Sequence, residues 1–208
     1  MKRLLKKVVE LKKANVKRII SRRIEEFKKL RKSSNSKLFN ELCFCILTAN
    51  FSAGRSMKIQ NEIGNGFLVL PKTNLAEKLK KYGHRFPNKR AEYIVDARVY
   101  KNSIKSIINS FEDEKELREW LVRNIRGIGY KEASHFLRNI GFDNLAIIDF
   151  HIIDILARYK IIKKPSTLTK RKYLEIENIL RKIANKLNLT LAELDLYLWY
   201  METTKILK

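Results

Sequence analysis

Cysteine is almost absent from this chain of 208 residues, which contains only Cys43 and Cys45. Two thiols are too few for a disulfide framework. They are also too few for an iron–sulfur cluster or a zinc ribbon that is held by four cysteines. We therefore expect two small buried apolar residues and predict no metal site.

Glycine and proline are scarce as well, with seven and three residues. Long segments run without a residue that breaks a helix, and their apolar residues recur at helical spacing. Strand-like alternation is rare, and its best candidate is the short apolar run at residues 67–70. The sequence predicts an all-α fold.

Long apolar runs are missing. None approaches the length of about 20 residues that a membrane-spanning helix needs. The basic N-terminus also lacks the uninterrupted apolar stretch and the cleavage site of a signal peptide. These absences predict a cytoplasmic protein without a membrane partner.

Acidic residues are outnumbered: the chain has 45 Lys and Arg against 22 Asp and Glu, a formal net charge of +23. Such a charge indicates a polyanionic partner, nucleic acid first and an acidic membrane surface second. Residues 2–32 hold 14 Lys or Arg and three Glu, a net of +11. This stretch forms either a plain solvated face or a surface that attracts DNA, and the overall charge favours the second.

Apolar spacing predicts helices along nearly the whole chain. Residues 2–32 form one long helix or two consecutive ones, and a break follows at residues 33–36. The next segment, 37–49, is apolar nearly all round, which is typical of a buried helix. Later helices are expected at residues 112–124, 130–140, 150–160, 170–187 and 191–203.

Residues that begin helices are recognisable at three places. Asn74 with Glu77 predicts a capping box for a short helix, and Thr190 with Glu193 predicts another for the last helix. Pro87 opens a helix that we expect to run for about twenty residues.

The most informative segment contains Gly127, Ile128 and Gly129 between two predicted helices. Each glycine can adopt a positive φ and lets another backbone come close, so the pair predicts a tight hairpin with Ile128 in the groove between the helices. Free N–H groups at the start of the second helix form an anion site, and a phosphate is the natural anion for so basic a chain. Lys131 begins that second helix, and Asp149 follows 18 residues later after an apolar run.

This pattern, Gly-Ile-Gly-x-Lys and then an apolar run that ends in Asp-x-His, resembles the helix–hairpin–helix DNA glycosylase superfamily. Members with this lysine are bifunctional: they remove a damaged base and then nick the strand. The resemblance implies that the amine of Lys131 attacks C1′ and forms a Schiff base. A free lysine has a pKa of about 10.4, and this chemistry requires a value near about 7–8.

The resemblance gives Asp149 the role of stabilising the positive charge that develops on the sugar. The alternative is a purely structural role, in which Asp149 only caps the helix that follows it.

Further residues resemble one branch of the superfamily. Residues 45–55 are similar to the segment of 8-oxoguanine DNA glycosylases whose Asn fills the space of the extruded base and whose Arg contacts the orphaned cytosine. On that match these roles fall to Asn50 and Arg55. The chain ends without the cysteines of the iron–sulfur branches, and as a whole it resembles the small type 2 8-oxoguanine DNA glycosylase/lyase family of archaea and some bacteria. In that family the C-terminal carboxylate helps to recognise the lesion, which implies binding roles for Lys208 and Trp199.

For four residues the sequence leaves more than one role open. Trp199 is either part of the base pocket or a core aromatic of the last helix. His135 lies one turn after Lys131, where the eukaryotic-type enzyme has Cys, and either contacts the base or is a structural histidine. His151 resembles a residue that touches a flanking phosphate, and Phe86, in a basic loop, is either the wedge that replaces an extruded base or a core residue.

We therefore expect two helical subdomains, one formed by residues 37–145 and ending in the hairpin, the other by residues 1–36 plus 146–208. Lys131 and Asp149 would face an interdomain DNA-binding cleft between them.

The predicted function is excision of 8-oxoguanine from duplex DNA, followed by strand cleavage through β-elimination. The chemistry requires no cofactor, although the hairpin carbonyls are expected to hold a monovalent cation, and the chain is expected to act as a monomer. A glycosylase for another damaged base and a non-catalytic helix–hairpin–helix DNA-binding module are the alternatives.

Overall fold

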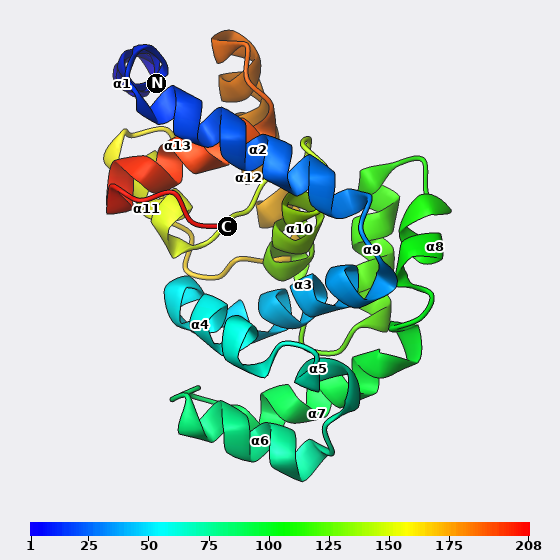
Figure 1. Cartoon of the computed structure of the whole chain (residues 1–208). Coiled ribbons are helices and arrows are strands. Elements are labelled where there is room, and N and C mark those ends of the chain that lie inside the picture. The colour runs from blue at the N-terminus through cyan, green and yellow to red at the C-terminus, as the bar shows by residue number, and fades with distance from the viewer.

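The computed structural model describes residues 1–208 and consists of helices without strands, which confirms the all-α prediction (Figure 1). No helix has the length and apolar character that crossing a membrane requires. The elements, in chain order, are α1 (Lys2–Lys13), α2 (Val16–Arg31), α3 (Asn35–Thr48), α4 (Ala53–Ile63), α5 (Gly66–Val69), α6 (Lys72–Lys81), α7 (Pro87–Ala97), the short 3-10 helix η1 (Arg98–Tyr100), α8 (Ile104–Asn109), α9 (Glu114–Asn124), α10 (Tyr130–Asn139), α11 (Phe150–Arg158), α12 (Lys170–Leu187) and α13 (Leu191–Thr203).

Several helix ends follow the local signals in the sequence. The basic N-terminal stretch is two consecutive helices, and the apolar segment after it forms the buried helix α3, where Ser34 provides the N-cap. The last helix begins with the predicted capping box: Thr190 accepts a hydrogen bond from the Glu193 backbone N–H, and the Glu193 carboxylate accepts one from the Thr190 N–H at 2.8 Å.

The prediction of a twenty-residue helix from Pro87 is wrong, because a side chain that is distant in the sequence binds the backbone where the helix is interrupted. Helix α7 ends at Ala97, and regular α-helix resumes only at Ile104. The Asn35 amide donates to the Asn102 carbonyl at 2.7 Å, and its oxygen accepts from the Lys105 backbone N–H at 2.8 Å. These bonds replace the helical ones at the break.

Two shorter elements also differ from expectation. The apolar run at residues 67–70 lies mostly in the single-turn helix α5 rather than in a strand. Asn74 does not cap α6, which already begins at Lys72 with Pro71 at the N-cap. The earlier start buries Leu75, whose N–H donates to the Pro71 carbonyl at 2.9 Å.

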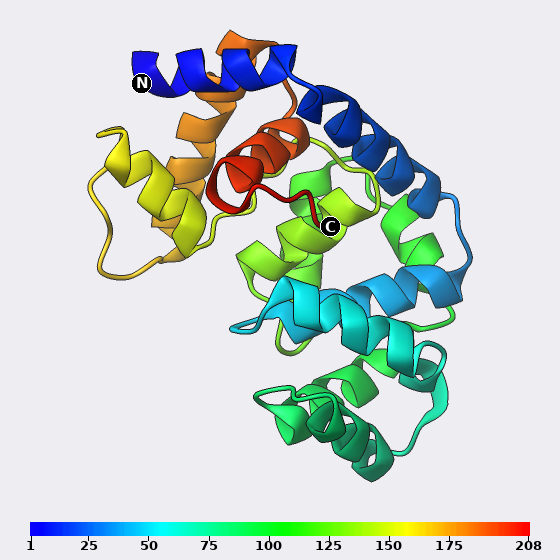
Figure 2. The ribbon, with the colours of Figure 1, turned by 60° about the vertical axis from the view of Figure 1, so that its left-hand side comes forward.

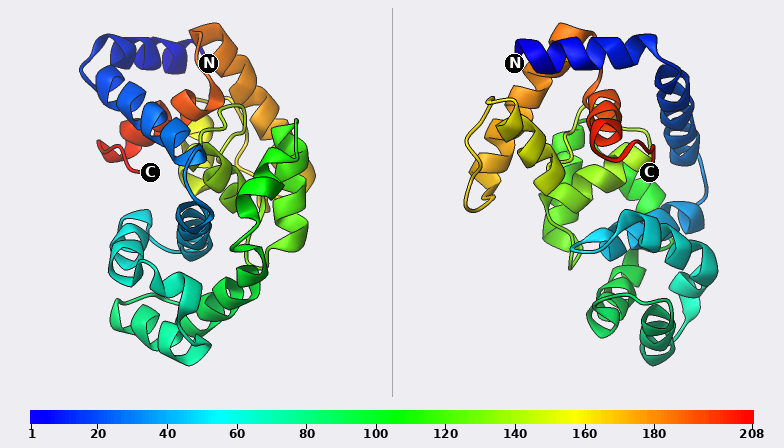
Figure 3. Two further views of the ribbon diagram at one scale, coloured as in Figure 1. Left: turned by 45° about the vertical axis from the view of Figure 1, so that its right-hand side comes forward. Right: turned by 90° about the vertical axis from the view of Figure 1, so that its left-hand side faces the viewer.

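Buried apolar side chains form two hydrophobic cores. One contains 27 residues, all from the segment 38–145, and the other contains 22 residues from the segments 4–27 and 146–198. Figure 2 shows α1 and α2 beside α12 and α13 in one half of the molecule, with α3 to α8 in the other. The views in Figure 3 place α6 and α7 at the end of the molecule opposite α1. We propose that the two cores correspond to two subdomains.

A buried ion pair connects the two cores. Arg118 of α9 donates two hydrogen bonds to Glu177 of α12, at 2.5 and 3.1 Å, and both side chains are at most 3% exposed. Ser134 bonds to Arg118, and the Ala146 N–H donates to Glu177 at 3.0 Å, so the charges are embedded in a hydrogen-bonded network. Such a pair fixes the relative position of two helices because its geometry is directional.

Removing one partner of this pair would leave a buried charge without compensation. We expect Arg118→Met to lower the free energy of unfolding by about 3–5 kcal/mol, measured by urea denaturation. As a control, Arg22→Ala removes an exposed pair with Glu26 and should cost less than about 1 kcal/mol. Equal losses from the two substitutions would contradict a special role for the buried pair.

Candidate active site

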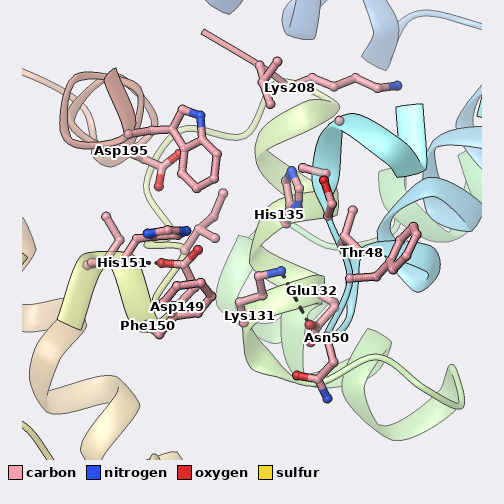
Figure 4. A pocket seen from close by; sticks show the side chains of 18 of the residues that line it. Thr48, Asn50, Lys131, Glu132, His135, Asp149, Phe150, His151, Asp195 and Lys208 are labelled. Carbon is pink, nitrogen blue, oxygen red and sulfur yellow. Dashed lines mark hydrogen bonds and ion pairs between the residues drawn. The ribbon is translucent and has the colours of Figure 1, made fainter. Parts of the chain in front are cut away.

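A cleft of about 1010 Å³ lies where the two cores meet (Figure 4). Its walls come from the loop after α3, the loop before α7, the first turns of α10 and α11, one face of α13 and the C-terminal residues. The residues predicted from the sequence that line it are Asn50, Phe86, Lys131, His135, Asp149, His151, Trp199 and Lys208. Those that do not line it are Arg55, Gly127, Ile128 and Gly129.

The glycine hairpin joins α9 to α10. Gly127 has a φ of 82°, and a Cβ there would lie 2.2 Å from the Tyr93 ring, so only glycine fits. Gly129 has a φ of −101°, which corrects the expectation that both glycines can exploit positive φ. Ile128 is 5% exposed and belongs to the first core, so its side chain plugs the hairpin and leaves only its backbone for a ligand.

The start of α10 carries an acidic side chain. The Gly129 N–H donates to the Glu132 carboxylate at 3.3 Å, and another oxygen of that carboxylate lies 3.7 Å from the Lys131 ammonium. Glu132 therefore occupies one N–H of the predicted phosphate site and is a counter-ion for Lys131. No cluster of His, Cys, Asp and Glu has the composition of a metal site.

Lys131 and Asp149 lie on opposite walls of the cleft, one from α10 and one from the start of α11 (Figure 4). The Lys131 side chain is 23% exposed. Asp149 is the N-cap of α11, and its Oδ1 accepts from the Ile152 N–H at 3.0 Å. The cap foreseen as an alternative is thus present, and the same residue also faces the cleft.

Asn50 and Phe86 lie on two loops that are tied together. Asn50 follows α3 with a φ of 56°, and Phe86 is 38% exposed just before α7. Between them, His84 bonds to the Leu47 carbonyl through Nε2 at 3.1 Å and accepts from the Phe86 N–H through Nδ1 at 3.0 Å. This arrangement gives His84, for which the sequence indicated no role, a structural one. Arg55 is exposed on α4, outside the cleft lining.

Two residues at the other end of the cleft carry buried polar atoms without partners. His135 is 6% exposed, and neither its Nδ1 nor the Nε1 of Trp199 has a hydrogen-bond partner. Burial holds the pKa of His135 well below its ordinary value, and the charges of Arg138 and Lys131 act in the same direction. The His151 ring meets the Trp199 ring edge to face at 5.1 Å between centroids. Buried polar atoms are normally paired, so these two atoms are exceptions among the residues that line the cleft.

The sequence did not single out two further lining residues. Asp195 of α13 pairs with Arg138 of α10, and burial raises the pKa of Asp195 to about 6 against the opposing charge of Arg138. Phe150 is 64% exposed between Asp149 and His151. An acid between two leucines of α13 and an aromatic directly after Asp149 were the available signals.

Comparisons with known proteins identify a family for the chain. The sequence profile described as 8-oxoguanine DNA glycosylase matches residues 20–189. The chain is 61% identical over 206 residues to the 8-oxoguanine DNA glycosylase/AP lyase of Methanocaldococcus jannaschii, with 99% of each chain covered. It is 44% identical over 208 residues to that of Thermotoga maritima, again with 99% of each covered.

Solved structures extend the similarity to three dimensions. The Methanocaldococcus jannaschii 8-oxoguanine glycosylase/lyase in complex with a 15mer DNA containing 8-oxoguanine superposes with a TM-score of 0.96 over 99% of both chains, at 61% identity. The 8-oxoguanine DNA glycosylase of Thermotoga maritima has a TM-score of 0.94 at 44% identity, over 100% of this chain and 99% of the other.

His84 makes stability depend on pH, because burial lowers its pKa in the folded protein. The unfolded chain takes up this proton near about pH 6.5, so the contribution of His84 is complete above that pH and is lost as pH falls. We expect urea unfolding to show that His84→Asn is less stable than wild type at about pH 7.5. The gap should narrow by up to about 1.4 kcal/mol per pH unit on acidification. The other titrations are common to both proteins and cancel, so a constant gap would refute this role.

Proposed function

Because the chain belongs to the 8-oxoguanine DNA glycosylase family, we propose that it excises 8-oxoguanine from duplex DNA and cleaves the strand at the same site. As a member of this family it is a DNA glycosylase and AP lyase. The observation that carries the proposal is the placement of Lys131 and Asp149 across one cleft of a chain with a net charge of +23.

In the first step the uncharged amine of Lys131 attacks C1′ of the extruded nucleotide. The N–C1′ bond forms as the bond between C1′ and the base breaks, and the base leaves with the bonding electron pair and takes up a proton. Positive charge develops on the sugar, and the Asp149 carboxylate on the facing wall stabilises it.

In the second step the attached nitrogen loses a proton, and its lone pair expels the ring oxygen, which takes up a proton as the Schiff base with C1′ forms. Loss of a proton from C2′ then moves electrons toward C3′, the bond from C3′ to the phosphate oxygen breaks, and the strand is cut 3′ to the lesion. Water hydrolyses the remaining imine and releases Lys131. The balance needs no oxidant, reductant or metal ion.

We assign the DNA contacts from the resemblance in sequence, and those of Asn50, Phe86 and His151 also from their position in the cleft. Asn50 and Phe86, on the joined loops, fill the space of the extruded base, and His151 contacts a flanking phosphate. The backbone of residues 127–129 binds another phosphate, together with a monovalent cation. Arg55, exposed beside the Asn50 loop, reaches the orphaned cytosine.

The base pocket is assigned to Trp199, His135 and the terminal carboxylate of Lys208. 8-Oxoguanine carries an N7–H donor where guanine has an acceptor, so a carboxylate accepts a hydrogen bond from the lesion and repels guanine. A site built around such a bond rejects the analogue that lacks the donor. We further propose that the chain acts on duplex DNA as a monomer.

Borohydride trapping on duplex DNA that contains 8-oxoguanine tests the nucleophile. We expect a covalent adduct with wild type and none with Lys131→Gln, because only a primary amine forms an imine that borohydride can reduce. If wild type binds this DNA but yields no adduct, the chain is a monofunctional glycosylase or a binding module. If an adduct forms only with DNA that contains another lesion, that lesion and not 8-oxoguanine is the substrate.

Asp149→Asn separates the charge of Asp149 from its capping role. Asn is as good an N-cap as Asp, so the melting temperature should hardly change. Single-turnover excision should slow by at least about a hundredfold, because the developing positive charge loses its counter-ion. Asp154→Asn, one turn later on α11 and paired with Lys164, is the matched control and should retain activity. If Asp149→Asn excises 8-oxoguanine as fast as wild type, Asp149 serves only as the N-cap of α11.

A further inference from the structure

The last residues of the chain cross from one core to the other. Helix α13 ends at Thr203, and Thr204 closes it in a left-handed conformation. No hydrogen bond between two backbone groups holds residues 206–208, although the Lys208 backbone lies against the His135 side chain, and Leu207 and Lys208 line the cleft. A terminus without such bonds frays unless something else fixes it.

A side-chain socket on α3, α4 and α10 fixes the end of the chain. The Lys208 ammonium donates to Glu41 at 2.6 Å and to the amide oxygen of Gln60, and it lies 4.4 Å from the centroid of the Phe44 ring. Glu41 also accepts from the Asn139 amide at 2.7 Å and from the Gln60 amide at 3.2 Å. Every polar group of the socket therefore has a partner.

The charge of Glu41 explains why Lys208 must be there. Glu41 is 3% exposed in the otherwise apolar buried helix α3, and a carboxylate at such a position is costly without a cation. Lys208 is its one ion-pair partner. The ammonium is therefore drawn into the socket, and the length of one side chain then sets the position of the last backbone atoms.

We propose that Glu41, Gln60 and Asn139 are positioning residues, which anchor the Lys208 ammonium so that the terminal carboxylate stays at the base pocket. In Figure 4 the Lys208 side chain extends away from the wall that carries Asp149 and Asp195, while its backbone end lies above His135. One residue thus serves two sites: its side chain fills the socket and its α-carboxylate remains for the ligand. The proposal rests on the proposed function, in which that carboxylate reads the N7–H of 8-oxoguanine.

Glu41→Gln tests the socket, because it keeps the shape of the side chain and removes only the charge. Carboxypeptidase B, which releases C-terminal Lys, reports on the anchor without any DNA, with the truncated product measured by mass spectrometry. We expect Glu41→Gln to lose Lys208 at least about ten times faster than wild type, since the charge-assisted bond is gone.

The same variant separates positioning from general damage. Excision of 8-oxoguanine should fall at least about tenfold in single turnover, while cleavage of a preformed abasic site, which has no base to recognise, should stay within about twofold of wild type. Gln60→Leu removes one acceptor of Lys208 without leaving a charge unpaired, and it should change both readouts in the same direction by less. Glu202→Gln is the matched control: Glu202 lies on the C-terminal helix α13 and pairs with Arg158 of α11. This substitution should change neither the release of Lys208 nor the excision of 8-oxoguanine.

Three outcomes for Glu41→Gln would overturn the proposal. Carboxypeptidase B could release Lys208 no faster than from wild type, or it could release Lys208 faster while excision stays unchanged. Excision and abasic-site cleavage could also fall by the same factor. If wild type excises no 8-oxoguanine at all, the proposed function fails, and protection of Lys208 alone then decides whether the socket exists.

Discussion

Buried ion pairs cross the boundary between the two hydrophobic cores, and the geometry of the cleft depends on them. Arg118 meets Glu177, Arg138 meets Asp195, and Lys208 meets Glu41. In each pair one partner belongs to the segment 38–145 and the other to the C-terminal part of the chain. Apolar surfaces can slide past each other at little cost, whereas a buried charge that loses its partner is strongly unfavourable, so these pairs hold the two halves in one relative position.

This constraint matters because the facing walls of the cleft belong to different halves. Lys131 rests on α10, next to the first core, and Asp149 begins α11, which packs into the second. Arg138 lies on the same helix as Lys131, and its pair with Asp195 ties that helix directly to α13. The separation of the Lys131 amine and the Asp149 carboxylate is therefore set by contacts that involve neither group. In the reaction that we propose, a displacement of about 1 Å would be enough to slow the chemistry.

The other walls are also held by polar contacts rather than by apolar packing alone. His84 joins the two loops that carry Asn50 and Phe86, and Arg90 adds a bond to the Ala49 carbonyl at 2.6 Å. Exposed loops of this kind would otherwise be mobile. The loops that carry Asn50 and Phe86 are thus tied down on one side of the cleft, and the end of the chain is tied down on the other.

Local information in the sequence predicted most of the helices and the cap of the last one, and it singled out Lys131 and Asp149. Apolar spacing predicted the all-α fold and Gly127 marked the hairpin, where the structure leaves no room for a Cβ beside Tyr93. The reaction was expected from the resemblance to a known family and not from the spacing of Lys131 and Asp149 alone. The break after α7 was not visible, because it depends on Asn35, which is distant along the chain. No local pattern in the sequence singled out Asp195 or Glu41. Only the tertiary structure decided which cation each of them meets, since ion pairing depends on proximity in space, and spacing along the chain reports only contacts within one helix or turn.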